Sequence, residues 1–226
     1  MPLLVFLLKF SIKRAAATSL AAIFLTAVAG VIGYAINDGV VWLAALLLSA
    51  GSTLGAYIGA RLLQVLSQQL IMWIYIAILV LLAARMFFPA EDTVSRFAPN
   101  SLVLIGLFTV GLIAGVMAGL LGVGGGIMVV PLLIAFFGLT SFEAKGTSLF
   151  MQIPAAIVGT LTNMKYGMVD LKASAVIGVI AAAVSYAGVA TALVLPPTVA
   201  NVLFACIMLY TAGQFAARAL RSRRQR

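Results

Sequence analysis

Seven apolar runs, each close to the ~20 residues that a helix needs to cross a bilayer, dominate this chain. Two further apolar pieces, 1–9 and 127–138, are too short to cross as straight helices. Since lipid offers no partner to a peptide group, apolar segments of this length must satisfy their own backbone hydrogen bonds. We therefore predict an all-α integral membrane protein with about seven full transmembrane helices plus short broken-helix segments. The seven runs are 15–36, 41–60, 69–88, 100–121, 146–164, 173–194 and 199–217.

The composition agrees with a bilayer as the solvent. Hydrophobic residues make up 64% of the 226 residues and charged residues 8%, against about 25% charged in soluble domains. The net charge of +9 comes from cations that flank apolar runs and from an arginine-rich C-terminal tail. This placement favours the lipid bilayer as partner over nucleic acid, for which no motif is present. With no histidine and one cysteine, Cys206, the chain predicts no internal disulfide, no metal site and no cofactor.

The chain repeats itself at an offset of 129 residues. Pro2-Leu3-Leu4 recurs as Pro131-Leu132-Leu133, and Thr18-Ser19-Leu20 recurs as Thr147-Ser148-Leu149. A fixed period of this kind predicts a duplicated architecture. We expect a first repeat at 1–90, a linker at 91–99, and a second repeat with the basic tail at 100–226. A glycine cluster precedes only the second copy, so the first repeat is expected to be N-terminally incomplete.

Counting crossings along the chain separates the charges into two sides, provided that 127–138 with the glycines before it counts as one crossing. One side receives mostly cations, and the other a mixture with more acids than cations. By the positive-inside rule the cationic side is the cytoplasm. We thus predict a multi-pass protein of the cell inner (plasma) membrane with a cytoplasmic C-terminus. The two copies then cross in opposite directions, as the inverted repeats of secondary transporters do. The cationic side holds Lys9, Lys13, Arg14, Arg61, Lys165, Lys172, Asp170 and the arginine tail, and the other side holds Asp38, Arg85, Glu91, Asp92, Arg96, Glu143 and Lys145.

The glycine cluster Gly122, Gly124, Gly125 and Gly126 lies five residues before Pro131. Glycines at this density predict a broken helix whose exposed N–H groups and positive helix end bind an anion. The alternative is a patch of small residues where helices approach closely. No βαβ unit surrounds the cluster and no GxxxxGK[ST] sequence occurs, so neither dinucleotide binding nor ATP-driven transport is predicted.

Two pairs of hydroxyl residues occupy equivalent places in the repeats: Thr18 and Ser19 in the first, Thr147 and Ser148 in the second. Both pairs are predicted within the first turn or so of a helix. They either cap these helices or bond to a neighbouring helix, or they bind a ligand oxygen near the repeat interface. Gln152 lies about one turn after Ser148 and shares its face. Together with Pro2 and Pro131, these residues and the glycine cluster form the candidate substrate site.

The combined motif resembles the sulfite exporter TauE/SafE family, also called DUF81 or TSUP transporters. The residues that carry the resemblance are Gly119 to Gly126, Pro131-Leu132-Leu133, Ala144 to Leu149 and Tyr166 to Asp170. The family implies an inner-membrane secondary carrier of small anions such as sulfite, sulfonates and related organosulfur compounds, in some members driven by an ion gradient. It also implies that the glycine cluster, Pro131, Thr147, Ser148 and their first-copy counterparts belong to the twin conserved segments. Family members normally begin with a glycine-rich helix, which this chain lacks.

The sequence therefore predicts a secondary transporter of small organic or sulfur oxyanions that works by alternating access between the two copies. A coupling ion is a further expected partner, and the oligomeric state is left open. The alternative is a non-transporting membrane fragment or assembly partner. An enzyme is not predicted, because neither a nucleophile–base pair nor a metal set is visible.

Overall fold

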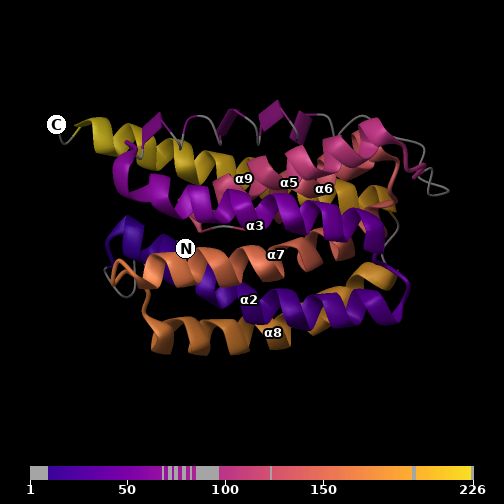
Figure 1. Cartoon of the computed structure of the whole chain (residues 1–226), viewed down its shortest axis with the longest axis horizontal. Coiled ribbons are helices and arrows are strands. Elements are labelled where there is room, and N and C mark those ends of the chain that lie inside the picture. Colours follow the sequence, from indigo (N-terminus) through magenta and orange to yellow (C-terminus); the bar gives the residue numbers. More distant parts are fainter. Residues whose placement is uncertain are drawn as a thin grey trace.

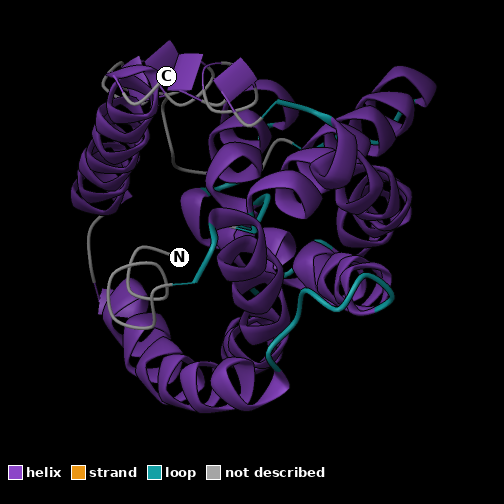
Figure 2. Ribbon diagram, turned by 90° about the vertical axis from the view of Figure 1, so that its left-hand side faces the viewer, coloured by secondary structure: helices purple, strands orange, loops and turns teal. Residues whose placement is uncertain are grey.

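The computed structural model describes residues 10–67, 69–70, 73, 76–77, 80–81, 83–84, 97–122, 124–194 and 197–224. This part of the chain is helical and contains no strand. The helix axes run along the long direction of the molecule in Figure 1 and are seen more nearly end-on in Figure 2. The helices are α2 (Ile12–Ile36), α3 (Trp42–Val65), α5 (Ser101–Leu121), α6 (Gly126–Phe137), α7 (Ser141–Met164), α8 (Leu171–Val194) and α9 (Pro197–Arg224).

Six of the seven predicted runs coincide with one of these helices. By length and composition, α2, α3, α5 and α8 can each cross a membrane, whereas α6 is a shorter apolar helix. The arginine-rich tail differs from the expectation, because α9 continues through it to Arg224. Most of the run at 69–88, most of the linker at 91–99 and the segment at 1–9 lie outside the described residues.

The tightest packing joins α3 to α5 through glycines spaced four residues apart. Gly51, Gly55 and Gly59 of α3 lie against backbone atoms of Phe108, Leu112 and Val116. Gly111, Gly115 and Gly119 of α5 lie against Leu48, Ser52 and Ala56 in return. A methyl group at any of these glycines would collide with the backbone of the other helix, so only glycine permits this separation. Gly119, just before the glycine cluster, therefore serves close packing between helices, which the sequence analysis offered as the alternative to anion binding.

The 129-residue offset extends from the sequence to the boundaries and turns of the helices. Ser11 caps α2 by accepting from the Arg14 N–H, and the equivalent Thr140 caps α7 by accepting from the Glu143 N–H. The turn after α2 has a positive φ of 54° at Asp38, and the turn after α7 has 66° at the equivalent Gly167. Helix α3 begins at residue 42 and α8 at residue 171. Equivalent segments therefore adopt the same local structure.

Helix packing exchanges partners between the two copies. Helix α2 packs on α8 and α7 packs on α3, while α2 and α7 also pack on each other. In Figure 1, α7, α2 and α8 lie next to one another in one half of the molecule, with α3, α5, α6 and α9 in the other. Each copy is thus held largely by helices of the other copy.

Candidate functional site

The α5–α6 connection is a helix break that requires glycine. Helix α5 ends at Leu121, and Gly122 adopts a left-handed conformation with φ 61°, its N–H donating to the Ala118 carbonyl. A side chain at Gly122 would also collide with the backbone of Ala16 in α2. Gly124 has a positive φ of 77° as well. The predicted break is confirmed, and it lies against α2 in the interior of the protein.

The start of α6 lies beside α7. A β-carbon built on Gly124 or Gly126 would collide with the Gln152 side chain, and one on Gly126 would come within 3.6 Å of Ser148 Oγ. Gln152 Nε2 donates to the Ser148 carbonyl at 3.2 Å, and Ser148 Oγ donates to the Lys145 carbonyl at 2.8 Å. The N-cap position, Gly125, supplies no side chain, so the positive end of α6 remains open to another acceptor. The structure thus brings together four of the predicted residues: Gly124, Gly126, Ser148 and Gln152.

Pro131 lies buried within α6, five residues after its first residue, Gly126. Because proline has no N–H, the carbonyl four residues earlier loses its helical partner. The missing N–H at Pro131 thus weakens a short helix that begins at glycines. Its predicted counterpart, Pro2, lies outside the described residues.

Thr18 and Thr147 serve neither as caps nor as members of the cluster around Gln152. Both are fully buried in the second turn of their helices, since α2 and α7 begin three to five residues earlier than predicted, at Ile12 and Ser141. Thr147 Oγ1 accepts from the Val41 N–H at 3.0 Å, and Thr18 Oγ1 accepts from the Asp170 N–H at 3.1 Å. The capping explanation is therefore wrong, and bonding between helices is what the threonines do. Ser19, beside Thr18, is only partly buried.

These two hydrogen bonds are equivalent under the sequence offset. Residue 18 corresponds to 147, and residue 41 corresponds to 170. In each bond a threonine of one copy holds the residue that precedes α3 or α8 of the other copy. The bonds join the two copies at opposite ends of α2 and α7.

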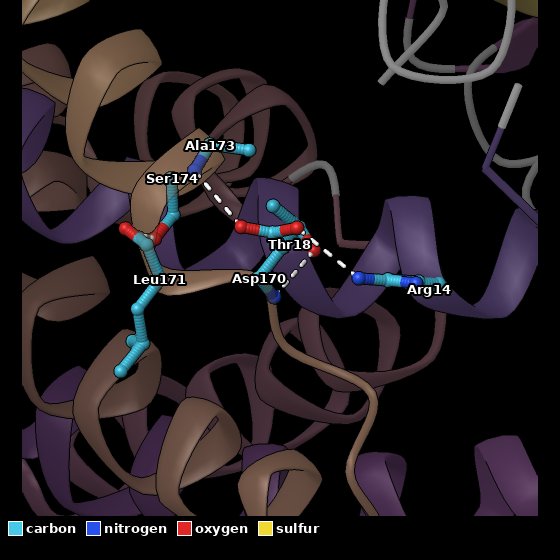
Figure 3. A network of polar contacts seen from close by, with 6 residues as sticks. All are labelled: Arg14, Thr18, Asp170, Leu171, Ala173 and Ser174. Carbon is cyan, nitrogen blue, oxygen red and sulfur yellow. Dashed lines mark hydrogen bonds and ion pairs between the residues drawn. The ribbon is translucent and has the colours of Figure 1, made fainter. Parts of the chain in front are cut away.

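A polar cluster surrounds the Thr18 bond (Figure 3). Asp170 Oδ2 accepts from Arg14 Nη2 at 3.1 Å, and Asp170 Oδ1 accepts from the Ala173 N–H at 3.1 Å, which caps α8. The Ala173 hydrogen bond, assisted by the Arg14 charge, lowers the pKa of Asp170. The sequence analysis places Asp170 only on the cationic side of the membrane, so the cap and the ion pair to α2 are new features of the structure.

Sequence reasoning left Asn163 of α7 out of the site, although it is a polar amide within an apolar helix. It is fully buried, and neither amide atom finds a hydrogen-bond partner among the described residues. Its backbone carbonyl accepts from the Met168 N–H, which places it near the Thr18–Asp170 bond. A buried amide without a partner costs free energy, so Asn163 has unused capacity to bind a polar species. Within the described part of the chain, no three acidic, cysteine or histidine side chains are arranged to hold a metal ion.

Comparison with known proteins gives a family and several relatives. A family model described as sulfite exporter TauE/SafE matches residues 1–86 and 107–226. A probable membrane transporter protein of Xylella fastidiosa strain Temecula1 is 26% identical over 157 residues, which cover 68% of this chain and 59% of that protein. Probable membrane transporter protein MJ0441 of Methanocaldococcus jannaschii is 36% identical over 85 residues, covering 35% of this chain and 32% of its own length.

Probable membrane transporter protein YunE of Bacillus subtilis is 41% identical over 73 residues, covering 29% of this chain and 27% of its own length. No solved structure gives a significant match. The chain spans less than two thirds of the length of these relatives.

Proposed function

The chain belongs to the sulfite exporter TauE/SafE family, and on that premise we propose that it is a secondary transporter of small anions. Its relatives are named as membrane transporter proteins, and its helices fit a multi-pass membrane protein. The substrates we expect are sulfite, sulfonates and related organosulfur or organic anions. Transport proceeds by alternating access between two inverted repeats, with a coupling ion as a further partner.

The observation that carries the proposal is the reciprocal pair of threonine bonds. Thr18 bonds to residue 170, directly after α7 and its turn, and Arg14 pairs with the same residue. The beginning of α2 therefore lies beside the end of α7, so the two helices run in opposite directions. Equivalent helices that run antiparallel and bind each other's copies are what a pseudo-two-fold axis in the membrane plane would produce. Such an axis allows two packings of similar free energy, one open to each side.

The substrate site we propose is the start of α6 beside Ser148 and Gln152. A broken helix there offers backbone N–H groups and a positive dipole end to an oxyanion. Ser148 Oγ donates to the Lys145 carbonyl and Gln152 Nε2 to the Ser148 carbonyl, and both can turn to a ligand oxygen at the expense of a weak local bond. Glycine at 124 and 126 keeps Gln152 next to the backbone.

The distribution of charge supports an orientation with the C-terminus in the cytoplasm of the inner membrane. Arg14, Arg61, Lys165 and Lys172 lie at the end of the bundle where α2 begins and α7 ends. Helix α9 follows α8, is counted as the next crossing, and ends in arginines. A C-terminal green fluorescent protein fusion should fluoresce, and a C-terminal alkaline phosphatase fusion should be inactive; the reverse pattern contradicts this orientation.

Flux measurements on the full chain in proteoliposomes test the function. Uptake of radiolabelled sulfite, a sulfonate and a carboxylate should exceed that of protein-free vesicles for at least one anion. Gln152→Leu and Ser148→Ala should reduce this flux strongly, while Thr109→Val, a change on an exposed face of α5, should leave it intact. If the folded wild type moves none of these anions, the non-transporting alternative is favoured.

A further inference from the structure

An open groove lies between α2, α7 and α8, and its lining residue Ala156 is one helical turn from Gln152 of the proposed anion site. It has a volume of about 440 Å³ and is lined by alkyl and aromatic side chains, with hydroxyl groups only from Thr160 and Ser174. Leu161 and Leu171 line it and are each 54% exposed, so it opens at the surface that faces lipid. A groove of this chemistry suits an alkyl chain and not a small oxyanion.

The equivalent place in the other half of the protein is occupied by aromatic rings. Ala21 and Leu171 of the groove correspond to Phe150 and Trp42 under the 129-residue offset. The rings of Phe150 and Trp42 meet edge-to-face with centroids 5.5 Å apart. At the groove, an alanine and a leucine in their place leave room. The positions equivalent to Ala21 and Leu171 are thus filled by two rings in contact in the other half.

A basic rim lies at the end of the groove where α2 and α8 begin. Arg14 is two turns before Ala21 on α2, Lys165 is one turn after Leu161, and Lys172 directly follows Leu171. Each of the three helices that form the groove thus contributes one cation, and all three side chains reach the surface. Asp170 pairs with Arg14, whereas Lys165 and Lys172 make no ion pair with any described residue.

The other half lacks these cations too. The positions equivalent to Arg14, Lys165 and Lys172 are Glu143, Ile36 and Leu43. The groove and its basic rim in one half therefore correspond, in the other half, to a pair of aromatic rings without these three cations. This coincidence is explained by one ligand that has an alkyl chain and a negative head.

We propose that an anionic phospholipid binds here, with its phosphate at Arg14, Lys165 and Lys172 and an acyl chain in the groove. Two helical turns, or roughly 10 Å, separate Arg14 from Ala21, so a chain that starts at the rim enters the groove below the headgroup. The acyl chain gains van der Waals contacts in the groove. It gains no free energy from the hydrophobic effect, because it moves there from lipid and not from water. Selectivity among lipids therefore comes from the charges, at about fivefold for each exposed cation.

Native mass spectrometry of the full chain in neutral detergent tests the proposal, with phosphatidylglycerol and phosphatidylcholine of identical acyl chains added in turn. One phosphatidylglycerol should be retained in preference to phosphatidylcholine. The double variant K165Q/K172Q should weaken phosphatidylglycerol retention about 25-fold and leave phosphatidylcholine unaffected. K145Q, which removes a cation at the other end of α7, should retain phosphatidylglycerol like the wild type.

The groove is tested by A21F, which introduces the aromatic ring that the other half has at position 150. It should abolish selective retention, whereas A183F, on an exposed face of α8 outside the groove, should not. Equal retention of both lipids by the wild type would overturn the proposal, as would K145Q matching K165Q/K172Q or A183F matching A21F. The double variant K165Q/K172Q alters exposed side chains only, so it decides the matter even if A21F fails to fold.

Discussion

Replacing Thr147 by valine should destabilise the protein measurably, although the two side chains have nearly the same shape. Thr147 is fully buried, and its Oγ1 accepts from the Val41 N–H at 3.0 Å. Valine leaves no cavity but removes that acceptor. A buried N–H group that loses its acceptor and cannot reach water costs about 1–3 kcal/mol of folding free energy. Hydrogen bonds between membrane helices contribute about 0.6 kcal/mol on average. Since Val41 is only half-buried, we expect about 1 kcal/mol, or roughly a fivefold fall in the folded-to-unfolded ratio.

The equivalent change, T18V, should cost a similar amount, because Thr18 is equally buried and accepts at 3.1 Å. The two bonds lie at opposite ends of the bundle, so the double variant T18V/T147V should lose about 2 kcal/mol by addition. T147S keeps the hydroxyl and should retain most of the stability.

Unfolding in mixed micelles of a neutral detergent and sodium dodecyl sulfate, followed by tryptophan fluorescence, measures these differences. Hydrogen exchange at the Val41 amide supplies a local readout, since T147V should accelerate it. T109V is the matched control: Thr109 is exposed and its hydroxyl donates within its own helix, so no other group depends on it. If T147V is as stable as T109V and exchange at Val41 is unchanged, the bond does not hold the two copies together.

Three further changes test other features. Gly115→Ala should lower the unfolding midpoint by forcing α5 away from Ser52, at about 1–3 kcal/mol, while Gly213→Ala, which meets no atom within 4 Å, should be neutral or slightly stabilising. In the folded protein the pKa of Asp170 is lowered, so its carboxylate stabilises the fold above the pKa of about 3.9 that it has in the unfolded chain. This stabilisation is lost as the pH falls through the folded-state pKa, and Asp170→Asn should remove it at every pH. The difference in melting temperature between D170N and wild type should therefore shrink from about pH 7 to about pH 3, and a constant difference would contradict the pairing. Asn163→Leu should keep or raise the melting temperature, because it removes a buried amide that has no partner among the described residues, and a marked loss of stability would show that the amide has a partner.

The sequence was sufficient to predict the approximate bounds of six of the described helices, because spans of the bilayer leave long apolar signals. The beginnings of α2 and α7 were placed too late, since their first turns carry Lys13 and Arg14, or Glu143 and Lys145. Such residues lower the apolar signal without interrupting the helix. The Thr140–Glu143 capping box is the local signature that marks the true start of α7.

The candidate site was predictable only in part. Glycine density revealed the break at Gly122, and helical spacing placed Gln152 with Ser148. Bonding between helices was one of the alternatives for Thr147, but its partner was not predictable, because Val41 is 106 residues away and donates through its backbone, which no side-chain pattern reports. Asn163 was visible as a polar residue, but its lack of a partner depends on what surrounds it in space.

The exchange of hydrogen bonds between the copies also has a consequence for biosynthesis. When the ribosome has completed α2 and α3, the N–H of Val41 and the hydroxyl of Thr18 are already in place, but Thr147 and Asp170 have yet to be translated. Until then, the Val41 N–H and the Thr18 hydroxyl must form hydrogen bonds with water or with lipid headgroups in place of their final partners. Each half carries groups that the other half needs, so neither half completes these bonds until translation has passed α7 and reached Asp170.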